Sequence, residues 1–274
     1  MAFFPYEMAL SAYLECPIGA RGFRGGAPQK KGHTLCLIPG TGSSRSVPWG
    51  KWYIKVYPAI RGSDIERWMA TPKIFILMTQ DPQKRQPYPE TQMKSNWPKT
   101  FSYLIKFKKI LLSRSSKSIR DLMNRTAFYA MFGIGPYTIS PYKVAWKFMS
   151  NDIFASVISQ HKTVFGYKTV IPTKTVAIFS TDTESEAHYL CAIINSKPVR
   201  DFIKSFSSAG RGFGTPSVME HVGIPKFNPK NPLHLKLAEI SKKCHQLKAE
   251  GKEKEIEKLE KENDELVKKL FNIK

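Results

Sequence analysis

The sequence predicts an α/β protein of the α+β kind, with a mixed, largely antiparallel sheet, flanking helices and a C-terminal helical or coiled-coil segment. Short runs rich in β-branched and aromatic residues recur between residues 52 and 180, separated by glycine- and proline-containing stretches. Helical periodicity occurs between several of these runs and dominates after residue 183. From residue 256 onward, apolar residues recur at alternating intervals of three and four, as in a coiled-coil seam.

Three parts are expected along the chain. Residues 1–51 are rich in glycine, proline and serine and show no periodicity, so we expect a basic arm or the remnant of an upstream domain. Residues 52–248 carry the predicted strands and most of the helices and should form the main domain. Residues 249–274 form a separate charged, amphipathic helix in this interpretation.

The main domain is predicted to begin with two strands, at 52–60 and 73–79, joined by a short turn. In that turn Asp64 and Glu66 lie two residues apart, beside Arg61 and Arg67. A carboxylate pair for acid–base chemistry is conceivable, but a salt-bridged turn is the favoured interpretation. A basic amphipathic helix is then expected over residues 96–114.

The second half of the domain alternates strands and helices. Three more strands are expected, at 142–148, 154–159 and 175–180. Thr183 and Glu186 have the spacing of a capping box and mark the start of a helix. Pro198 and Pro232 each occupy a position typical of a first helical turn, and the second of these helices should run to about Lys248.

The C-terminal seam contains Asn263 at a position where a polar residue fixes register in coiled coils. Gly251 separates this seam from the preceding helix. The seam could therefore pack on its own helical hairpin, on a partner subunit or on a second copy of the chain. Its predicted members are Ile256, Leu259, Asn263, Leu266, Leu270 and Ile273.

Charge is the strongest functional signal. The 274 residues include 43 Lys and Arg against 22 Asp and Glu, a formal net charge of +21. No acidic residue occurs between Glu15 and Asp64. Such an excess favours a polyanion-binding protein, above all a nucleic-acid-binding one, over charge that serves solubility alone.

Other classes of protein are disfavoured. The four cysteines are far apart and form no C-x-x-C pair, so we expect free thiols in a reducing cytoplasm. The six histidines do not form the spacings of zinc or metalloprotease motifs, so no metal site and no catalytic residue is predicted. No apolar run is long enough to span a membrane, so we expect a soluble, cytoplasmic protein without a membrane partner.

A glycine-rich loop places Gly210, Gly212 and Gly214 around Arg211 and Phe213. It follows a predicted helix, whereas a dinucleotide fingerprint lies between a strand and a helix, and no phosphate-binding G-x-x-x-x-G-K motif is present. The loop could present Arg211 and Phe213 to phosphates and bases, or be a plain tight turn.

Two further stretches have the chemistry of nucleic-acid contact. Along 142–148 the aromatic and apolar residues alternate with Lys143, Ala145 and Lys147, so one face could pack while two lysines meet phosphates. The segment 80–94 is rich in Gln, Lys, Arg and Pro and could read base edges, or be an ordinary surface loop.

Several of these stretches, in this order, resemble the C-terminal target-recognition region of adenine-N6 DNA methyltransferases, in particular the TaqI-like specificity domain of restriction–modification and phage-defence enzymes. The resemblance covers roughly residues 52–272. The stretches that carry it are "VYPAIRGSDIERWMATPKIFILMTQDP", "WPKTFSYLIKFKKILLSR", "PYKVAWKFMS", "EAHYLCAIINS", "RGFGTP", "IPKFNPKNPLHLKLAEISKKCHQL" and "IEKLEKENDELVKKLF".

That family also has a catalytic domain with a glycine-bearing S-adenosylmethionine motif and an Asn/Asp-Pro-Pro-Tyr/Phe motif, and neither is in this sequence. The resemblance therefore implies a duplex-DNA reader that does not methylate alone and has no cofactor of its own, since S-adenosylmethionine would belong to a missing catalytic domain. The alternatives are the specificity subunit of a split methyltransferase with a separate catalytic chain, an RNA-binding module and a decayed gene fragment. The expected DNA-binding residues are Arg61, Lys84, Arg85, Arg114, Lys143, Lys147, Arg211, Gly212 and Phe213.

Overall fold

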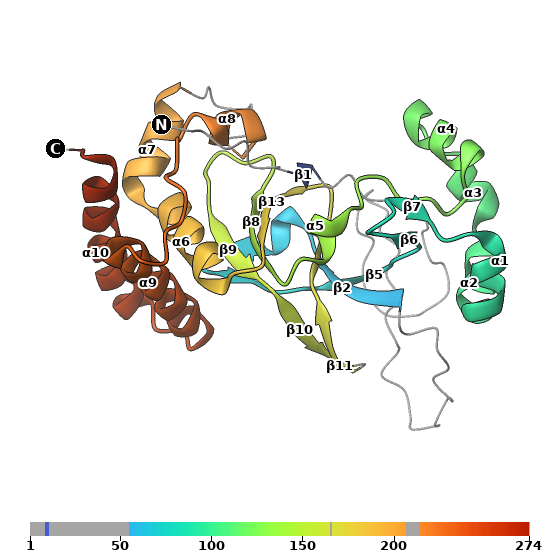
Figure 1. Ribbon diagram of the computed structural model, residues 1–274, viewed down its shortest axis with the longest axis horizontal. Coiled ribbons are helices and arrows are strands. Elements are labelled where there is room, and N and C mark those ends of the chain that lie inside the picture. Colours follow the sequence, from blue (N-terminus) through green and yellow to red (C-terminus); the bar gives the residue numbers. More distant parts are fainter. Residues whose placement is uncertain (1–8, 11–54, 165, 207–213, 274) are drawn as a thin grey trace, which may run out of the picture.

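The computed structural model describes residues 9–10, 55–164, 166–206 and 214–273. Strands occupy the middle of the molecule, one group of helices lies at each end, and a slender hairpin projects from the strands (Figure 1). This is the mixed α/β architecture with flanking helices that the sequence predicts. No helix of the described part of the chain is long and apolar enough to cross a membrane.

The main sheet is antiparallel throughout and has the strand order β1-β13-β8-β9. β8 is flanked by β13 and β9, and four of its six residues are buried. The predicted strands at 142–148, 154–159 and 175–180 are confirmed as β8, β9 and β13. The bounds are β1 Ala9–Leu10, β8 Tyr142–Lys147, β9 Ala155–Ile158 and β13 Val176–Thr181.

A second sheet has the order β12-β2-β5, with β12 parallel and β5 antiparallel to β2. It contains the two strands expected at the start of the domain. Three two-stranded pieces complete the strands: β3–β4, β6–β7 and the projecting β10–β11. The bounds are β2 Val56–Ile60, β3 Ile65–Glu66, β4 Met69–Ala70, β5 Ile74–Leu77, β6 Gln80–Asp81, β7 Gln86–Pro87, β10 Gln160–Thr163, β11 Gly166–Thr169 and β12 Ile171–Pro172.

One group of helices covers the main sheet. Every residue of α6 from Ala187 to Asn195 is buried, because α6 packs on β8, β9 and β13 on one side and on α9 on the other. The Asn195 side chain bonds the backbone at the start of β9. Its Oδ1 accepts from the Ala155 N–H (2.8 Å) and its Nδ2 donates to the Ala155 carbonyl (2.9 Å). The bounds are α6 Glu184–Asn195, α7 Lys197–Phe206, α8 Pro216–Glu220, α9 Pro232–Ala249 and α10 Glu253–Phe271.

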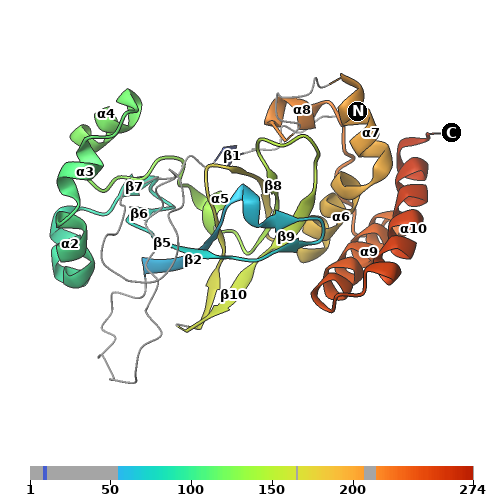
Figure 2. The same cartoon turned by 180° about the vertical axis from the view of Figure 1, so that it is seen from behind.

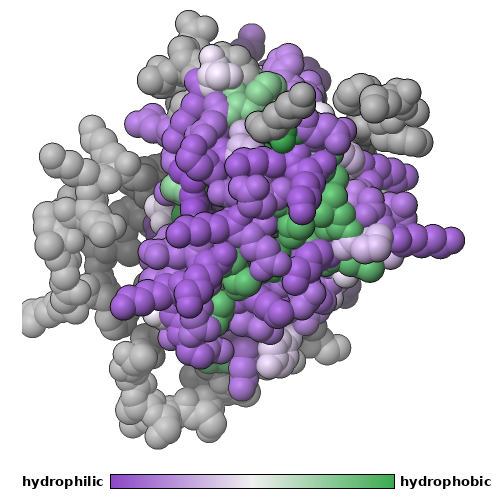
Figure 3. Space-filling view, turned by 90° about the vertical axis from the view of Figure 1, so that its left-hand side faces the viewer, coloured by the Kyte–Doolittle hydropathy of each residue, from purple (hydrophilic) through white to green (hydrophobic). Residues whose placement is uncertain are grey.

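The C-terminal helix α10 packs within the same chain. It lies against α9, α7 and α6, with Ile256, Asn263 and Val267 buried. Asn263 Nδ2 donates to the Ala192 carbonyl on α6 at 2.9 Å. Of the three arrangements left open for the seam, the described residues show packing on the chain's own helices. Seen from this end, the surface is hydrophilic and crossed by an apolar band (Figure 3).

The other group of helices stands beyond the second sheet. The single helix expected over 96–114 is two helices, because the chain turns at Lys106 and Phe107. The predicted loop at 80–94 is likewise wrong from Glu90 onward, where helix α1 begins. The bounds are α1 Glu90–Asn96, α2 Pro98–Ile105, α3 Lys108–Leu112, α4 Lys117–Arg125 and the short α5 Pro136–Ile139.

The predicted helix starts lie at the observed positions, but one predicted capping contact does not form. Thr183 is the N-cap of α6, yet the predicted capping box does not form, because Glu186 accepts a hydrogen bond from the Thr181 hydroxyl instead. Asn231 caps α9 ahead of Pro232, its side-chain oxygen accepting from the Leu233 N–H at 2.9 Å.

Candidate nucleic-acid interface

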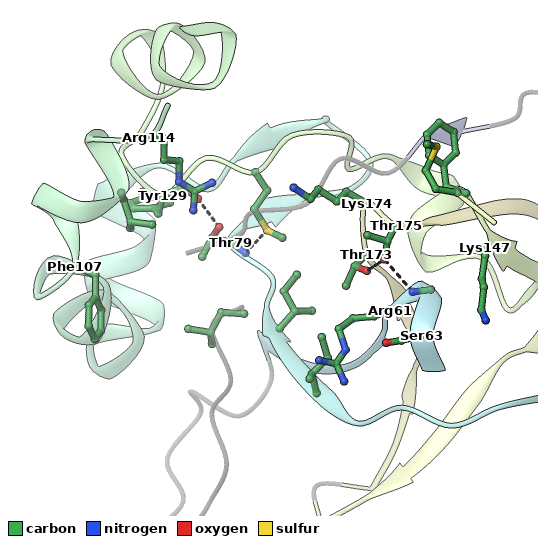
Figure 4. Close-up of a pocket in the computed structure, with 18 of the residues that line it drawn as sticks. Arg61, Ser63, Thr79, Phe107, Arg114, Tyr129, Lys147, Thr173, Lys174 and Thr175 are labelled. Atoms are coloured by element: carbon green, nitrogen blue, oxygen red, sulfur yellow. Dashed lines mark hydrogen bonds between the residues drawn. The ribbon is translucent and has the colours of Figure 1, made fainter. Parts of the chain in front are cut away.

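A pocket of about 600 Å³ lies between the second sheet, helices α2 and α3 and the end of β8 (Figure 4). Its floor is apolar: Ile74 and Ile76 of β5 line it from the sheet, and Leu111 of α3 and Phe107, which precedes α3, line the opposite side. Segments distant in sequence meet here, which is why the sequence alone does not reveal the pocket.

Four basic side chains line this pocket, each from a different segment: Arg61, Arg114, Lys147 and Lys174. No acidic side chain is among the described residues that line it. An apolar floor with several cations and no carboxylate favours a ligand that combines negative charge with flat, apolar surface, as a nucleotide chain does.

Arg61 is held by the turn in which it was predicted. Its guanidinium bonds the Asp64 carboxylate at 3.1 and 3.2 Å, and its backbone N–H bonds the same carboxylate at 2.9 Å. Asp64 is buried, whereas the Arg61 side chain is 41 % exposed. The salt-bridged turn is thus confirmed, and it leaves part of the arginine facing the pocket.

Gly62 brings this turn close to the loop that follows β12. Its N–H donates to the Thr175 hydroxyl at 2.9 Å, and a Cβ at this position would lie 2.8 Å from the Thr175 carbonyl oxygen. Because a side chain would push the two segments apart, glycine is required for the approach. The approach places Lys174 on the same pocket as Arg61.

The opposite wall is fixed by hydrogen bonds at the end of β5. The Thr79 hydroxyl donates to the Tyr129 carbonyl at 2.7 Å, and the Thr79 N–H approaches Met131 Sδ at 3.4 Å. Arg114 follows α3 and is 8 % exposed, with its side chain reaching into the pocket (Figure 4). Its carbonyl accepts from the Arg120 guanidinium, which holds the end of α3 against α4.

The glycine-rich loop returns to the fold beside this pocket. Trp146 Nε1 donates to the Gly214 carbonyl at 3.0 Å. A Cβ on Gly214 would lie 2.1 Å from the Lys147 carbonyl oxygen, so only glycine can sit this close to the end of β8. Gly214 is therefore needed for packing. Arg211, Gly212 and Phe213 lie outside the described residues.

Lys143 corrects one expectation. The alternation along β8 assigned Lys143 and Lys147 to an open face, but Lys143 is fully buried and donates to the Ser140 carbonyl at 2.7 Å. Burial lowers the pKa of its ammonium to about 7. A phosphate cannot reach Lys143 in this structure, because β8 is covered on both faces.

The β6–β7 turn carries the predicted Lys84 and Arg85 on the surface. Asp81 Oδ1 accepts the N–H groups of Gln83 and Lys84 at 2.9 and 3.3 Å, and Arg85 has a left-handed backbone with φ 55°. Gln80, by contrast, is buried and bonds the Met131 N–H at 2.9 Å, so its amide is used within the fold.

Two lysines that the sequence interpretation did not single out form a band with aromatic rings. Lys55 Nζ lies 4.0 Å from the Tyr88 ring centre and 4.3 Å from that of Trp97, and Lys168 Nζ lies 5.2 Å from that of Tyr57. Burial lowers the pKa of both ammonium groups. The spacing of Lys55 and Tyr57 on one strand face could have shown half of this band.

Comparisons with known proteins give two likenesses. No protein-family model matches the chain. The type II methyltransferase M.NspV of Nostoc sp. is 32 % identical over 156 residues, which are 55 % of this chain and 29 % of that protein. The structure of the Type IIL restriction–modification enzyme MmeI in complex with DNA aligns with a TM-score of 0.55 at 11 % identity, covering 82 % of this chain and 29 % of that one.

The fold is related to that of restriction–modification enzymes. The chain spans less than a third of the length of either protein. These likenesses do not distinguish the TaqI-like specificity type from other members, so that finer assignment stays a prediction.

Of the expected DNA-binding residues, Arg61, Arg114 and Lys147 meet at one pocket, while Lys84 and Arg85 lie on the separate β6–β7 turn. Lys174 joins the first group and was missed. Its signal was present: the segment 153–181 contains no acidic residue, and Lys174 is exposed in the Thr-Lys-Thr loop of that segment.

Proposed function

We propose that this chain binds duplex DNA as the target-recognition part of an adenine-N6 DNA methyltransferase of a restriction–modification or phage-defence system. The observation that carries the proposal is the pocket at which Arg61, Arg114, Lys147 and Lys174 converge, with no acidic side chain among the described residues that line it and Asp64 paired to Arg61 behind the lining. Cationic side chains from separate segments can contact successive phosphates of a polyanion. Each such contact releases counterions from the nucleic acid. That MmeI was solved with DNA supports this choice of ligand.

The charge of the neighbouring helices supports the same ligand. Residues 94–125, which include α2, α3 and α4, carry nine basic residues and one acidic residue. Phosphate contacts of this kind position a duplex without reading it, so base recognition must come from other side chains.

Methyl transfer would then require a catalytic domain beyond this chain's own residues. M.NspV matches over only 29 % of its length, which is consistent with a recognition part joined to, or assembled with, a separate catalytic part. S-adenosylmethionine would bind to that catalytic part. Turnover that appears only when this chain is mixed with a catalytic chain would identify a split enzyme.

The test is a fluorescence-anisotropy titration of the full chain with a mixed-sequence DNA duplex, its single strands and the matching RNA duplex over about 50–200 mM salt. We expect the DNA duplex to bind most tightly, with a steep decline as salt rises. Preference for RNA, or weak binding to all three, would refute the proposal.

Variants locate the interface. Lys147→Ala and Lys174→Ala should each weaken duplex binding and reduce the log–log salt slope by about 0.9, the value for one lost phosphate contact. Lys254→Ala is the matched control, because Lys254 is an exposed lysine on α10, at the other end of the molecule (Figure 1). Equal effects at all three positions would show that the pocket is not the contact surface.

A further inference from the structure

The β10–β11 hairpin stands apart from both larger sheets. Among the described residues its two strands pair only with each other, from Gln160↔Thr169 to Thr163↔Gly166. Both ribbon views show it projecting away from the body (Figures 1 and 2). The Thr163 hydroxyl closes the end of the ribbon by donating to the Gly166 carbonyl at 2.8 Å.

The end of the hairpin exposes apolar surface. Val164 is 80 % exposed and Tyr167 is 67 % exposed, more than any other large apolar side chain in the described part of the chain. Folding alone does not explain two such side chains at the tip of a projecting ribbon, since each gives up the stabilisation that burial would provide. Two such side chains at the end of a projecting ribbon provide an apolar surface that a partner molecule could cover.

The charge of the hairpin indicates which molecule. Between Asp152 and Asp182 the sequence contains no acidic residue, and the hairpin itself carries His161, Lys162 and Lys168. Lys162 is directly opposite Tyr167, so an ammonium and an aromatic ring share one face of the ribbon. A basic, apolar-tipped ribbon without carboxylates is complementary to nucleic acid.

The base of the hairpin lies on the sheet face that forms the pocket. Lys168 lies over the ring of Tyr57. Tyr57 is directly opposite Ile76 in the β2–β5 pair, and Ile76 lines the pocket. Residues directly opposite in an antiparallel pair point to the same face, so the pocket, the Lys168–Tyr57 contact and the hairpin are continuous.

We propose that the β10–β11 hairpin enters the major groove of a duplex held at the cationic pocket, with Val164 and Tyr167 against base edges and Lys162 toward a phosphate. The proposal rests on the proposed function and identifies a base-reading element for it. A two-stranded ribbon fits the major groove, which is about 12 Å wide. There, apolar side chains distinguish thymine by its 5-methyl group.

The test begins with selection of preferred duplexes from a random pool by the full wild-type chain. The selected duplex is then remade with deoxyuridine in place of thymidine at each position in turn, which removes one major-groove methyl group at a time. We expect at least one replacement to weaken wild-type binding by about tenfold, and Val164→Ser or Tyr167→Ser to abolish that sensitivity.

The same variants should bind the selected duplex about tenfold more weakly with an unchanged salt slope, because they remove no charge. Leu235→Ser is the control: Leu235 is 43 % exposed on α9, and its replacement should leave binding unchanged. Because the substituted side chains are exposed, folding should be preserved, and the midpoint of urea unfolding checks this.

The outcomes separate the two proposals. Duplex binding that is insensitive to every deoxyuridine and to both hairpin variants would overturn the hairpin assignment and leave the proposed function standing. Hairpin-dependent binding that is blocked by a minor-groove ligand, with no methyl effect, would overturn the major-groove assignment. Failure of the wild-type chain to bind any duplex would overturn both.

Discussion

Lowering the pH from about 7.5 to 5 should destabilise the fold, chiefly through His188. This histidine lies buried between α6 and α9, with Nδ1 3.0 Å from the Ser241 hydroxyl oxygen. The ring of His245 meets it edge-to-face at 5.0 Å between centres. Burial, followed by the charges of His245 and Lys242, lowers the pKa of His188 to about 3.

The direction of the pH effect follows from the difference in proton binding between the folded and the unfolded chain. An unfolded histidine titrates near pH 6.5, so between about 6.5 and 3 the unfolded chain binds more protons than the folded one. The stabilisation is therefore complete above pH 6.5 and is lost as the pH falls towards 3. At pH 5 the stability lost through His188 alone is about 2 kcal/mol. Burial also lowers the pKa of His245, which adds in the same direction.

The assay is urea unfolding at several pH values, followed by the fluorescence of the buried Trp68 and Trp146. His188→Asn keeps a polar group near Ser241 but removes the titration, so its stability should fall less on acidification, by about 2 kcal/mol. His221→Asn, at an exposed position after α8, is the control. If the two variants and the wild-type chain lose stability in parallel, the burial argument for His188 is wrong.

Three further predictions concern packing and burial. Lys143→Met should remove a rise in stability of about 2 kcal/mol between pH 7 and 9, because the unfolded lysine binds more protons there than the buried one, whose pKa is about 7; urea unfolding at both pH values measures it. Gly214→Ala should cost about 1–3 kcal/mol, because its Cβ would lie 2.1 Å from the Lys147 carbonyl oxygen, and duplex binding should weaken with it. Trp68→Phe removes the 2.6 Å bond from Nε1 to Glu260 and should cost about 1.5–3 kcal/mol in urea unfolding.

Each of these has a matched control. Lys254→Met, at an exposed position, should not change the pH profile. Gly223→Ala has no atom within 4 Å and meets only the strain of a backbone with φ 62°, so it should cost less than Gly214→Ala and leave DNA binding intact. Trp97→Phe keeps an aromatic ring beneath Lys55. If a control matches its test variant, the contact named for that variant is not the cause.

The strands could be predicted because runs of β-branched and aromatic residues between glycine and proline favour a strand, both by local preference and by burial. The sequence could not show which face of a strand is exposed to solvent. β8 lies between two strands and is covered by α6 on one face and by a second apolar cluster on the other, so both its residue series are buried. Alternation in the sequence then no longer reports exposure, and Lys143 was misplaced for that reason.

The candidate site was predictable in kind but not in arrangement. Most of its cations were identified from local charge, yet Arg61 and Lys174 meet because Gly62 lets a turn approach the loop after β12. Such a contact depends on tertiary packing between segments more than a hundred residues apart, and no periodicity records it. The hairpin was missed for a different reason: its strands contain Gln, His, Lys and Gly, which have weak strand signals.

Charge is distributed differently at the C-terminal helices and around the pocket. On the C-terminal helices lysines are paired with carboxylates, as in the ion pairs Lys236–Glu262, Lys242–Glu184, Lys243–Glu239, Lys248–Glu253 and Lys268–Glu265. Around the pocket and on α2–α4 basic residues greatly outnumber acidic ones. The charge of the described residues is therefore uneven, and under the proposed function it would attract a duplex to the pocket more strongly than to α9 and α10. We therefore expect that residues which stabilise the helical end, such as Glu260 with Trp68, can be changed without altering the surface proposed to contact DNA, so that mutations separate stability from binding.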